Sequence, residues 1–393
     1  MPWKTTSVTE ERAKFVQKYL EGGISLAALC RQAGISRKTG NKWVRRYERD
    51  GLHALEDRSR EAKTHPNEVS PEIEAWILRG RGKYPTWGPK KLVAWVKEKG
   101  GFERVCAVST AGEILHRHGL TVPRKGGKKN EIWAHPLTEC SEANRVWCVD
   151  FKGWFRLGNG RRCDPLTITD GYSRYLIKCQ ALERTDMETT KRIFEAAFRE
   201  YGLPEWIRSD NGSPFSGTGL GGFSGLSLWW LKLGITHERI EPGKPYQNGR
   251  HERMHLTLKR ETTQPAAFDL RAQQRRFNAF RQTFNQERPH EALGLKTPGS
   301  IYQRSTREYT GGFIEPEYAD GAVIRKVQKR GEFNWEGHRI FFGEAFAGEQ
   351  IAFEPEEEGI WTIKFGRVRL GSFDERNLKV KSATAPVNRQ RHP

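Results

Sequence analysis

The chain has 393 residues and a mass of 45.2 kDa, and its 67 Lys and Arg against 48 Asp and Glu give a formal net charge of +19. This length exceeds one ordinary domain, and a hydrophobic fraction of 36% is enough for real cores, so wholesale disorder is excluded. A mean hydropathy of −0.76 and the lack of a long uncharged apolar run exclude a membrane span.

The positive charge is concentrated at the start of the chain. Residues 1–130 carry a net charge of +13, residues 131–300 carry +5 and residues 301–393 carry +1. A pI near 9.7 favours a polyanion partner, most simply nucleic acid, with a basic solubility surface as the alternative. The first residues lack the apolar segment of a secretory signal, and the six Cys form no C-x-x-C pair. We therefore expect a cytoplasmic protein.

Residues 1–58 predict a helix-turn-helix DNA-binding domain. Ser25 and Ser36 are suited to cap two short helices, and Gly34 breaks the pattern between them. The helix after Ser36 is strongly basic and could lie in the major groove of DNA, although a basic surface helix of an ordinary bundle is the alternative. The candidate DNA contacts on this helix are Arg37, Lys38, Lys42, Arg45, Arg46 and Arg49.

Residues 59–123 predict a second, less basic unit of the helix-turn-helix or winged-helix type. It begins with a polar linker, and Ser70-Pro71 then opens a helix with Pro in its first turn. Residues 124–136 form a basic linker that could follow a phosphate backbone, with a solvated linker as an equal alternative. The candidate phosphate contacts in this linker are Lys125, Lys128 and Lys129.

Residues 137–303 predict a mixed α/β domain. β-rich runs between residues 144 and 182 fit two hairpins, and later strands end near Asp210 and Ile240. Four helices are predicted among them, at 186–201, 224–233, 247–261 and 269–286. The remaining segments are predicted as a linker at 304–320, a small β-barrel at 321–382 and a disordered tail at 383–393.

Three acidic residues stand out in the α/β domain. Asp150 lies in the middle of a strand, Asp210 at the end of another, and Glu252 in the first turns of a helix. A carboxylate among apolar strand neighbours must be paired, protonated or bound to metal. Three converging carboxylates could hold two divalent cations about 3.5–4 Å apart for in-line phosphoryl displacement. Oxygen ligands favour Mg²⁺ or Mn²⁺. The alternatives are a turn-forming Asp210 and a solvated Glu252.

The sequences around these acids resemble a known family. VWCVDFKGW around Asp150, SDNGSPF around Asp210 and PGKPYQNGRHER around Glu252 look like the three acids of DDE transposases and retroviral-type integrases. The likeness is strongest to bacterial insertion-sequence transposases with an integrase core. Asp170 to Arg174, and the RPHEAL…TP run from Arg288 to Pro298, match further motifs. The resemblance covers roughly 140–303, and the flanking modules extend it to nearly the whole chain.

This resemblance implies an RNase H-like core in which Asp150, Asp210 and Glu252 are the catalytic and metal-binding residues, with two Mg²⁺ or Mn²⁺ ions. It implies binding to the double-stranded DNA of transposon terminal repeats and of the target, 3′-end cleavage and strand transfer, by a homo-oligomer at the bacterial nucleoid. Lys259 follows Glu252 by two helical turns and is expected to contact DNA phosphate. His255 is a weaker candidate, because an exposed helix His is more often inert.

Two other classes of protein stay open. One is a domesticated DNA-binding regulator that keeps the fold without catalysis, and the other is an RNase H-like nuclease that cuts without joining. The sequence also departs from the family, because Asp210 and Glu252 are 42 residues apart, a longer interval than usual. We assign the extra length to a flexible Gly-rich insertion at 216–226.

Several other residues are set aside. No zinc site is expected, because the His and Cys residues lack a convincing zinc spacing. Three further carboxylates are alternatives to the chosen acids, namely Asp170, Asp164 and Glu241. We interpret Asp170 as a turn residue because Gly171 follows it.

Overall fold

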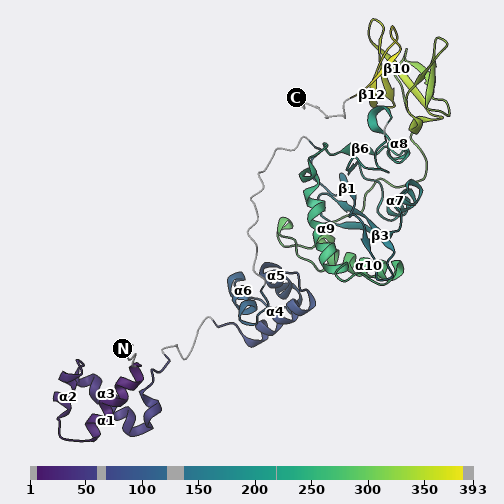
Figure 1. The fold of residues 1–393 in the computed structure, drawn as a ribbon. Helices are drawn as coiled ribbons and strands as arrows, with labels where there is room; N and C mark the ends of the chain where they lie inside the picture. The colour runs from purple at the N-terminus through teal and green to yellow at the C-terminus, as the bar shows by residue number, and fades with distance from the viewer. Residues whose placement is uncertain (1–6, 60–67, 122–136, 218, 384–393) are drawn as a thin grey trace. The chain divides into compact units, whose positions relative to one another are not determined.

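The computed structural model describes residues 7–59, 68–121, 137–217 and 219–383 (Figure 1). The chain divides into two compact units, Met1–Glu68 and Val69–Pro393, which are described separately below. Lys125, Lys128 and Lys129, with most of the predicted basic linker and tail, lie outside the described residues. No helix in the part of the chain that the structure describes is both long and apolar enough to cross a membrane.

The first unit is a helix-turn-helix bundle. Ser25 and Ser36 each accept a hydrogen bond from a backbone N–H in the first turn of the helix that follows, so both predicted caps are confirmed. The turn between these helices contains Gly34 at a φ of +65°. The core includes Phe15 and Trp43. The helices are α1 (Val8–Leu20), α2 (Leu26–Gln32) and α3 (Arg37–Asp50), followed by the short η1 (Leu52–Leu55).

The second unit begins with three further helices. The first of them has Pro71 at its start and Ser70 as its cap, as the sequence predicts. Ile77 and Trp87 are fully buried in their common core. Residues 68–121 contain no strand, so a wing is absent from that range. The helices are α4 (Pro71–Lys83), α5 (Pro89–Gly100) and α6 (Val108–Arg117).

A mixed sheet follows, with the strand order β4-β3-β1-β5-β6 and a short β2 beside β3. The pairs β4–β3 and β3–β1 are antiparallel, whereas β1–β5 and β5–β6 are parallel. This is the mixed sheet predicted for an RNase H-like core. The strands are β1 (Val146–Phe151), β2 (Phe155–Arg156), β3 (Arg162–Asp170), β4 (Leu176–Leu182), β5 (Trp206–Ser209) and β6 (Thr236–Arg239).

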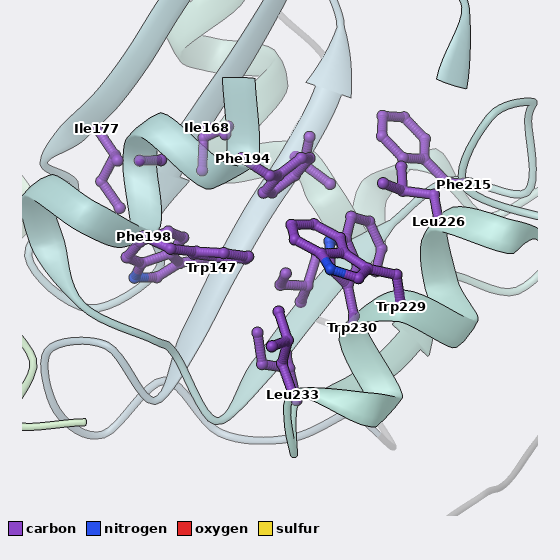
Figure 2. Close-up of a cluster of buried hydrophobic side chains, with 14 of the residues drawn as sticks. Trp147, Ile168, Ile177, Phe194, Phe198, Phe215, Leu226, Trp229, Trp230 and Leu233 are labelled. Atoms are coloured by element: carbon purple, nitrogen blue, oxygen red, sulfur yellow. The ribbon is translucent and has the colours of Figure 1, made fainter. Parts of the chain in front are cut away.

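Two separate hydrophobic clusters connect this sheet to its helices. The larger one joins Trp147 of β1 to Phe194 and Phe198 of one helix and to Trp230 of another (Figure 2). The smaller one joins β4 to the last two helices of the core. All four predicted helices are confirmed to within two residues at either end. They are α7 (Met187–Tyr201), α8 (Gly225–Lys232), α9 (Gly249–Thr262) and α10 (Leu270–Gln286).

The C-terminal region is antiparallel but is not the closed barrel that the sequence predicts. Within the described residues, its larger sheet is open, with the order β13-β12-β11-β10-β7, and a separate hairpin β8–β9 packs against it through aromatic residues such as Phe333 and Phe353. Alternating apolar residues fit both arrangements, so the pattern could not decide closure. The strands are β7 (Val323–Lys326), β8 (Glu332–Trp335), β9 (His338–Phe341), β10 (Gln350–Glu357), β11 (Ile360–Phe365), β12 (Val368–Asp374) and β13 (Lys379–Ser382).

The Gly-rich stretch 216–226 is also not the flexible insertion that we expected. Its described residues include the short η2 (Leu220–Gly222), whose Leu220 N–H donates to the Phe342 carbonyl at 3.2 Å. The Gly221 N–H donates to Ser382 Oγ at 2.9 Å. This stretch therefore attaches the core to the C-terminal sheet.

Candidate active site

The parallel pairing of β1 and β5 brings two of the three predicted acids to one edge of the sheet. Cys148 is aligned with Arg208, so continuing each strand by two residues places Asp150 beside Asp210. The Asp150 side chain is 23% exposed. Glu252 is exposed in the first turn of α9, which packs against β1.

The charges of Asp210 and Glu252 both act on Asp150. Burial raises the pKa of Asp150 to about 7, and the negative charges of Asp210 and then Glu252 contribute to this rise. The carboxylates are nevertheless not in common coordination contact. Among the described residues, no three His, Cys, Asp or Glu side chains form a group ready to hold a metal ion.

Two histidines of α9, the helix that carries Glu252, are buried against β3. His251 Nε2 and His255 Nε2 lie 2.7 and 2.6 Å from the hydroxyl of Thr167 on β3. His251 Nδ1 lies 2.8 Å from the Thr169 hydroxyl. Burial, with a smaller contribution from the charge of Lys152, lowers the pKa of His255 to about 3. Both imidazoles are therefore neutral at physiological pH, since burial also lowers the pKa of His251.

The expectation that His255 is exposed is wrong, because the residue is only 7% exposed. Sequence reasoning did not single out His251 at all. The signal that could have found both is the spacing of 251, 254, 255 and 258, which follows the i, i+3, i+4, i+7 pattern of a buried helix face. The apolar members of this face, Met254 and Leu258, are both buried.

A third buried histidine lies behind Asp210. The Ser209 hydroxyl donates to the backbone carbonyl of Asp210 at 2.7 Å and lies 2.8 Å from His237 Nε2. Burial, aided by the positive charge of Arg239, lowers the pKa of His237 to about 3. Each Asp of the site therefore has a hydroxyl–imidazole pair bonded to its own backbone carbonyl, since the Thr167 hydroxyl donates to the Asp150 carbonyl at 3.1 Å.

Positive charge also lies beside the acids. Lys259, the predicted phosphate contact, is exposed on α9. Burial and the charge of Lys259 lower the pKa of Lys152, while Asp150 opposes that shift, so the two lysines and Asp150 share one electrostatic environment. Lys152 was missed from the sequence because a single Lys after a strand carries no pattern.

The three rival carboxylates have protein partners of their own. Asp170 is fully buried and accepts hydrogen bonds from the N–H and the O–H of Ser173, in agreement with its interpretation as a turn residue. Asp164 accepts two hydrogen bonds from the Arg162 guanidinium. Glu241 accepts a hydrogen bond from the side-chain amide of Gln247 at 2.9 Å. These contacts give each rival a structural role.

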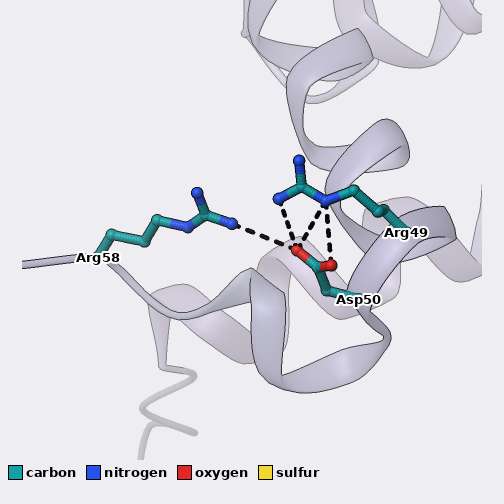
Figure 3. A network of polar contacts seen from close by, with 3 residues as sticks. All are labelled: Arg49, Asp50 and Arg58. Carbon is teal, nitrogen blue, oxygen red and sulfur yellow. Dashed lines mark hydrogen bonds and ion pairs between the residues drawn. The ribbon is translucent and has the colours of Figure 1, made fainter.

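The predicted DNA contacts of α3 differ in their environments. Arg46 is half-buried, with its guanidinium 4.9 Å from the Trp43 ring centroid. Arg49 is bonded to Asp50 at 2.6 and 3.0 Å, and Arg58 pairs with the same carboxylate (Figure 3). Arg49 is nevertheless exposed, as are the other four. These are Arg37, Lys38, Lys42 and Arg45.

Models of known families match successive parts of the chain. A helix-turn-helix domain matches residues 11–63, and a homeodomain-like domain matches 39–115. Integrase core domains match 141–245 and 233–298, and the C-terminal domain of IS481 family transposases matches 322–381. The chain thus combines helix-turn-helix matches, an integrase core and a match to the C-terminal domain of IS481 family transposases. Asp150 and Asp210 lie in the first core match, and Glu252 lies in the second.

The chain is similar to two curated insertion-element proteins. It is 29% identical over 255 residues to the IS407 uncharacterized 31.7 kDa protein of Burkholderia multivorans, covering 64% of this chain and 87% of the relative. It is 30% identical over 190 residues to the IS476 uncharacterized 39.2 kDa protein of Xanthomonas euvesicatoria, covering 48% of this chain and 51% of the relative. The match thus spans about half the length of the IS476 protein.

Among solved structures, the chain is similar to the HTLV-2 integrase catalytic core domain in complex with magnesium. The identity is 18%, the TM-score is 0.33, and the match covers 42% of this chain and 99% of that one. It is also similar to a chain of the simian T-cell lymphotropic virus intasome in complex with PP2A regulatory subunit B56 gamma. There the identity is 15%, the TM-score is 0.36, and the match covers 67% of this chain and 91% of that one.

Proposed function

We propose that this chain is an active DNA transposase that binds the terminal repeats of its element, cleaves their 3′ ends in a metal-dependent reaction and transfers them into target DNA. The observation that supports this most directly is the electrostatic environment of Asp150. Its pKa is raised by burial and by the charges of Asp210 and Glu252, which supports a single site formed by the three acids in the region that matches integrase cores.

The donor set fits hard divalent cations. Asp150, Asp210 and Glu252 offer only carboxylate oxygens, the ligands that Mg²⁺ and Mn²⁺ prefer. Their mutual repulsion around a half-buried carboxylate is relieved by a bound cation. Two such ions, when bound, supply charge stabilisation for both the attacking and the leaving oxygen of a phosphodiester. The three acids would hold them from two strands and one helix.

The rest of the chain would bind and align DNA. Lys152 and Lys259 place positive charge beside the acids, where a DNA phosphate would lie during cleavage. The exposed basic face of α3 would read the transposon end, in a domain that we assign to residues 1–58. We assign catalysis to 137–303 and the antiparallel sheet to 321–382. Because two ends must be joined to one target, the protein would act as a homo-oligomer on DNA.

The test is a joining assay with labelled end DNA, target plasmid and Mg²⁺. The wild type should give joined product, whereas Asp150→Asn, Asp210→Asn and Glu252→Gln should lose both cleavage and joining while keeping DNA binding. Asp164→Asn is the matched control, because it changes a paired carboxylate of the same sheet. Joining that persists in Asp150→Asn would contradict the site. Cleavage without joining would favour the nuclease, and DNA binding without either would favour the regulator.

A further inference from the structure

The Thr167 hydroxyl is the centre of a buried network that connects β1, β3 and α9. Its Oγ1 contacts the Asp150 backbone carbonyl at 3.1 Å, His251 Nε2 at 2.7 Å and His255 Nε2 at 2.6 Å. A carbonyl can only accept a hydrogen bond, so the single hydroxyl proton is donated to Asp150. Both imidazoles must then donate their Nε2–H to Oγ1. The contacts thus assign one tautomer to both histidines.

This tautomer also accounts for the second contact of His251. His251 Nδ1 is left as an acceptor, and the Thr169 hydroxyl donates to it at 2.8 Å. His255 Nδ1 is also an acceptor and lies 3.8 Å from Asp150 Oδ2, and two acceptors make no hydrogen bond with each other while the carboxylate is ionised. Two residues of α9 are therefore bonded to β3, and β3 is bonded to the backbone of the acid itself.

The network connects the strand that carries Asp150 to the helix that carries Glu252. Thr167 is the pairing partner of Asp150 in the β1–β3 ladder, and Glu252 lies between His251 and His255 in the sequence. Like charges on Asp150 and Glu252 tend to separate the strand from the helix. A buried network with every donor satisfied opposes that separation, because breaking it would leave imidazole N–H groups unpaired away from water.

We propose that Thr167, His251 and His255 are positioning residues that fix the helix carrying Glu252 against the strand carrying Asp150, so that the two carboxylates stay placed for one divalent cation. The proposal rests on the proposed function, since it assumes that the acids bind metal. The Ser209–His237 pair repeats the same arrangement behind Asp210, with the hydroxyl donating to that residue's carbonyl. All three histidines act through hydroxyls and touch no reacting atom.

The first test replaces the hydroxyl at the centre. In the full chain, Thr167→Val should raise the Kd for Mn²⁺, measured by calorimetry, by about 10–100-fold, the usual cost of losing a group that orients a metal ligand. It should also speed amide hydrogen exchange in α9. Thr167→Ser keeps the hydroxyl and should restore both readouts. Thr190→Val is the matched control, because Thr190 is equally buried and its hydroxyl donates to the backbone carbonyl of Asp186, the residue that caps α7.

Wild-type Mn²⁺ affinity and wild-type α9 exchange in a folded Thr167→Val protein would overturn the proposal. If that variant fails to fold, substitutions of His255 decide instead. Gln places an amide N–H near the position of imidazole Nε2 and can still donate to Thr167, whereas Asn reaches only the position of Nδ1. His255→Gln should therefore keep more Mn²⁺ affinity than His255→Asn. Equal or reversed affinities would overturn the network.

Failure of the proposed function has a different signature. If neither the wild-type protein nor the Asp150→Asn variant binds Mn²⁺, the metal-dependent function is contradicted. The exchange of α9 in Thr167→Val, which needs no metal, would then still report whether the network holds the helix.

Discussion

The buried carboxylate of Asp170 accepts a hydrogen bond from the backbone N–H of Asn144 at 2.7 Å, which joins the end of β3 to the residues that precede β1. The same carboxylate accepts two hydrogen bonds from Ser173. Asp150, one residue before the end of β1, instead has the acids Asp210 and Glu252 among its charged neighbours, and the charge of Lys152 opposes them. One sheet thus contains a buried acid that accepts several hydrogen bonds and another whose charge is opposed by two further acids.

We therefore expect the two acids to respond oppositely to substitution. Asp170→Ala leaves buried N–H groups without their acceptor and should lower the free energy of unfolding by about 1–3 kcal/mol. Asp150→Asn removes repulsion with its acidic neighbours and should not lower it. Denaturant unfolding at pH 8 in EDTA measures both. An equal loss of unfolding free energy in the two variants would mean that the charges around Asp150 do not destabilise the fold.

The buried histidines predict a loss of stability in mild acid. The folded pKa of His237 is about 3, below the value near 6.5 of an unfolded chain. The unfolded state therefore takes up a proton that the folded state refuses, and stability falls as pH drops from about 6.5 towards 3, by up to about 1.4 kcal/mol per pH unit for each such group. His237→Gln should reduce by one the number of protons that the protein takes up on unfolding, so stability should fall less steeply with decreasing pH. An unaltered slope across denaturant titrations at pH 7, 6 and 5 would contradict this.

Because the arginines of α3 differ in their surroundings, we expect them to contribute unequally to DNA binding. Arg45 is exposed, so Arg45→Ala should weaken binding to end DNA and reduce the slope of log K against log salt by about one. Arg49 already donates to Asp50, so Arg49→Ala should change that slope less. Fluorescence anisotropy at four salt concentrations compares the two. The interpretation of α3 fails if neither variant changes the slope.

We expect Lys259 to contact DNA and not a metal ion. Lys259→Ala should slow end cleavage and reduce the salt slope of core binding by about one, while the Kd for Mn²⁺ stays at the wild-type value. Lys259→Arg keeps the charge and should retain most cleavage. Pairing a cleavage time course with metal titration tests both parts. A weakened Mn²⁺ affinity in Lys259→Ala would assign the residue to the metal site instead.

Local rules predicted much of this fold because the signals lie within a few residues. Ser25 and Ser36 cap their helices as expected, and Pro71 starts α4. Asp150 could be singled out because a carboxylate inside an apolar strand is costly, and the charges of Asp210 and Glu252 raise its pKa. The helices of the core follow their hydrophobic periodicity.

What could not be predicted depends on partners far away in the sequence. The burial of His255 follows from its bond to Thr167, which is 88 residues distant. Closure of the C-terminal sheet depends on whether β13 meets β7, and no local pattern records that pairing. The Gly-rich stretch looked flexible because its composition has few side chains to pack, yet its backbone N–H groups bond to the C-terminal sheet.

The attachment of η2 and α8 to the C-terminal sheet determines which shortened fragments of this protein should stay folded. Leu228 of α8 is buried in the aromatic cluster of that sheet, and Lys232 pairs with Glu349 at 2.7 Å. A fragment ending at residue 303 would expose this apolar surface to water and should aggregate. A fragment beginning at residue 69 keeps the surface covered. For expression and crystallisation, the catalytic core and the C-terminal sheet are one piece, and the first helix-turn-helix domain is the removable one.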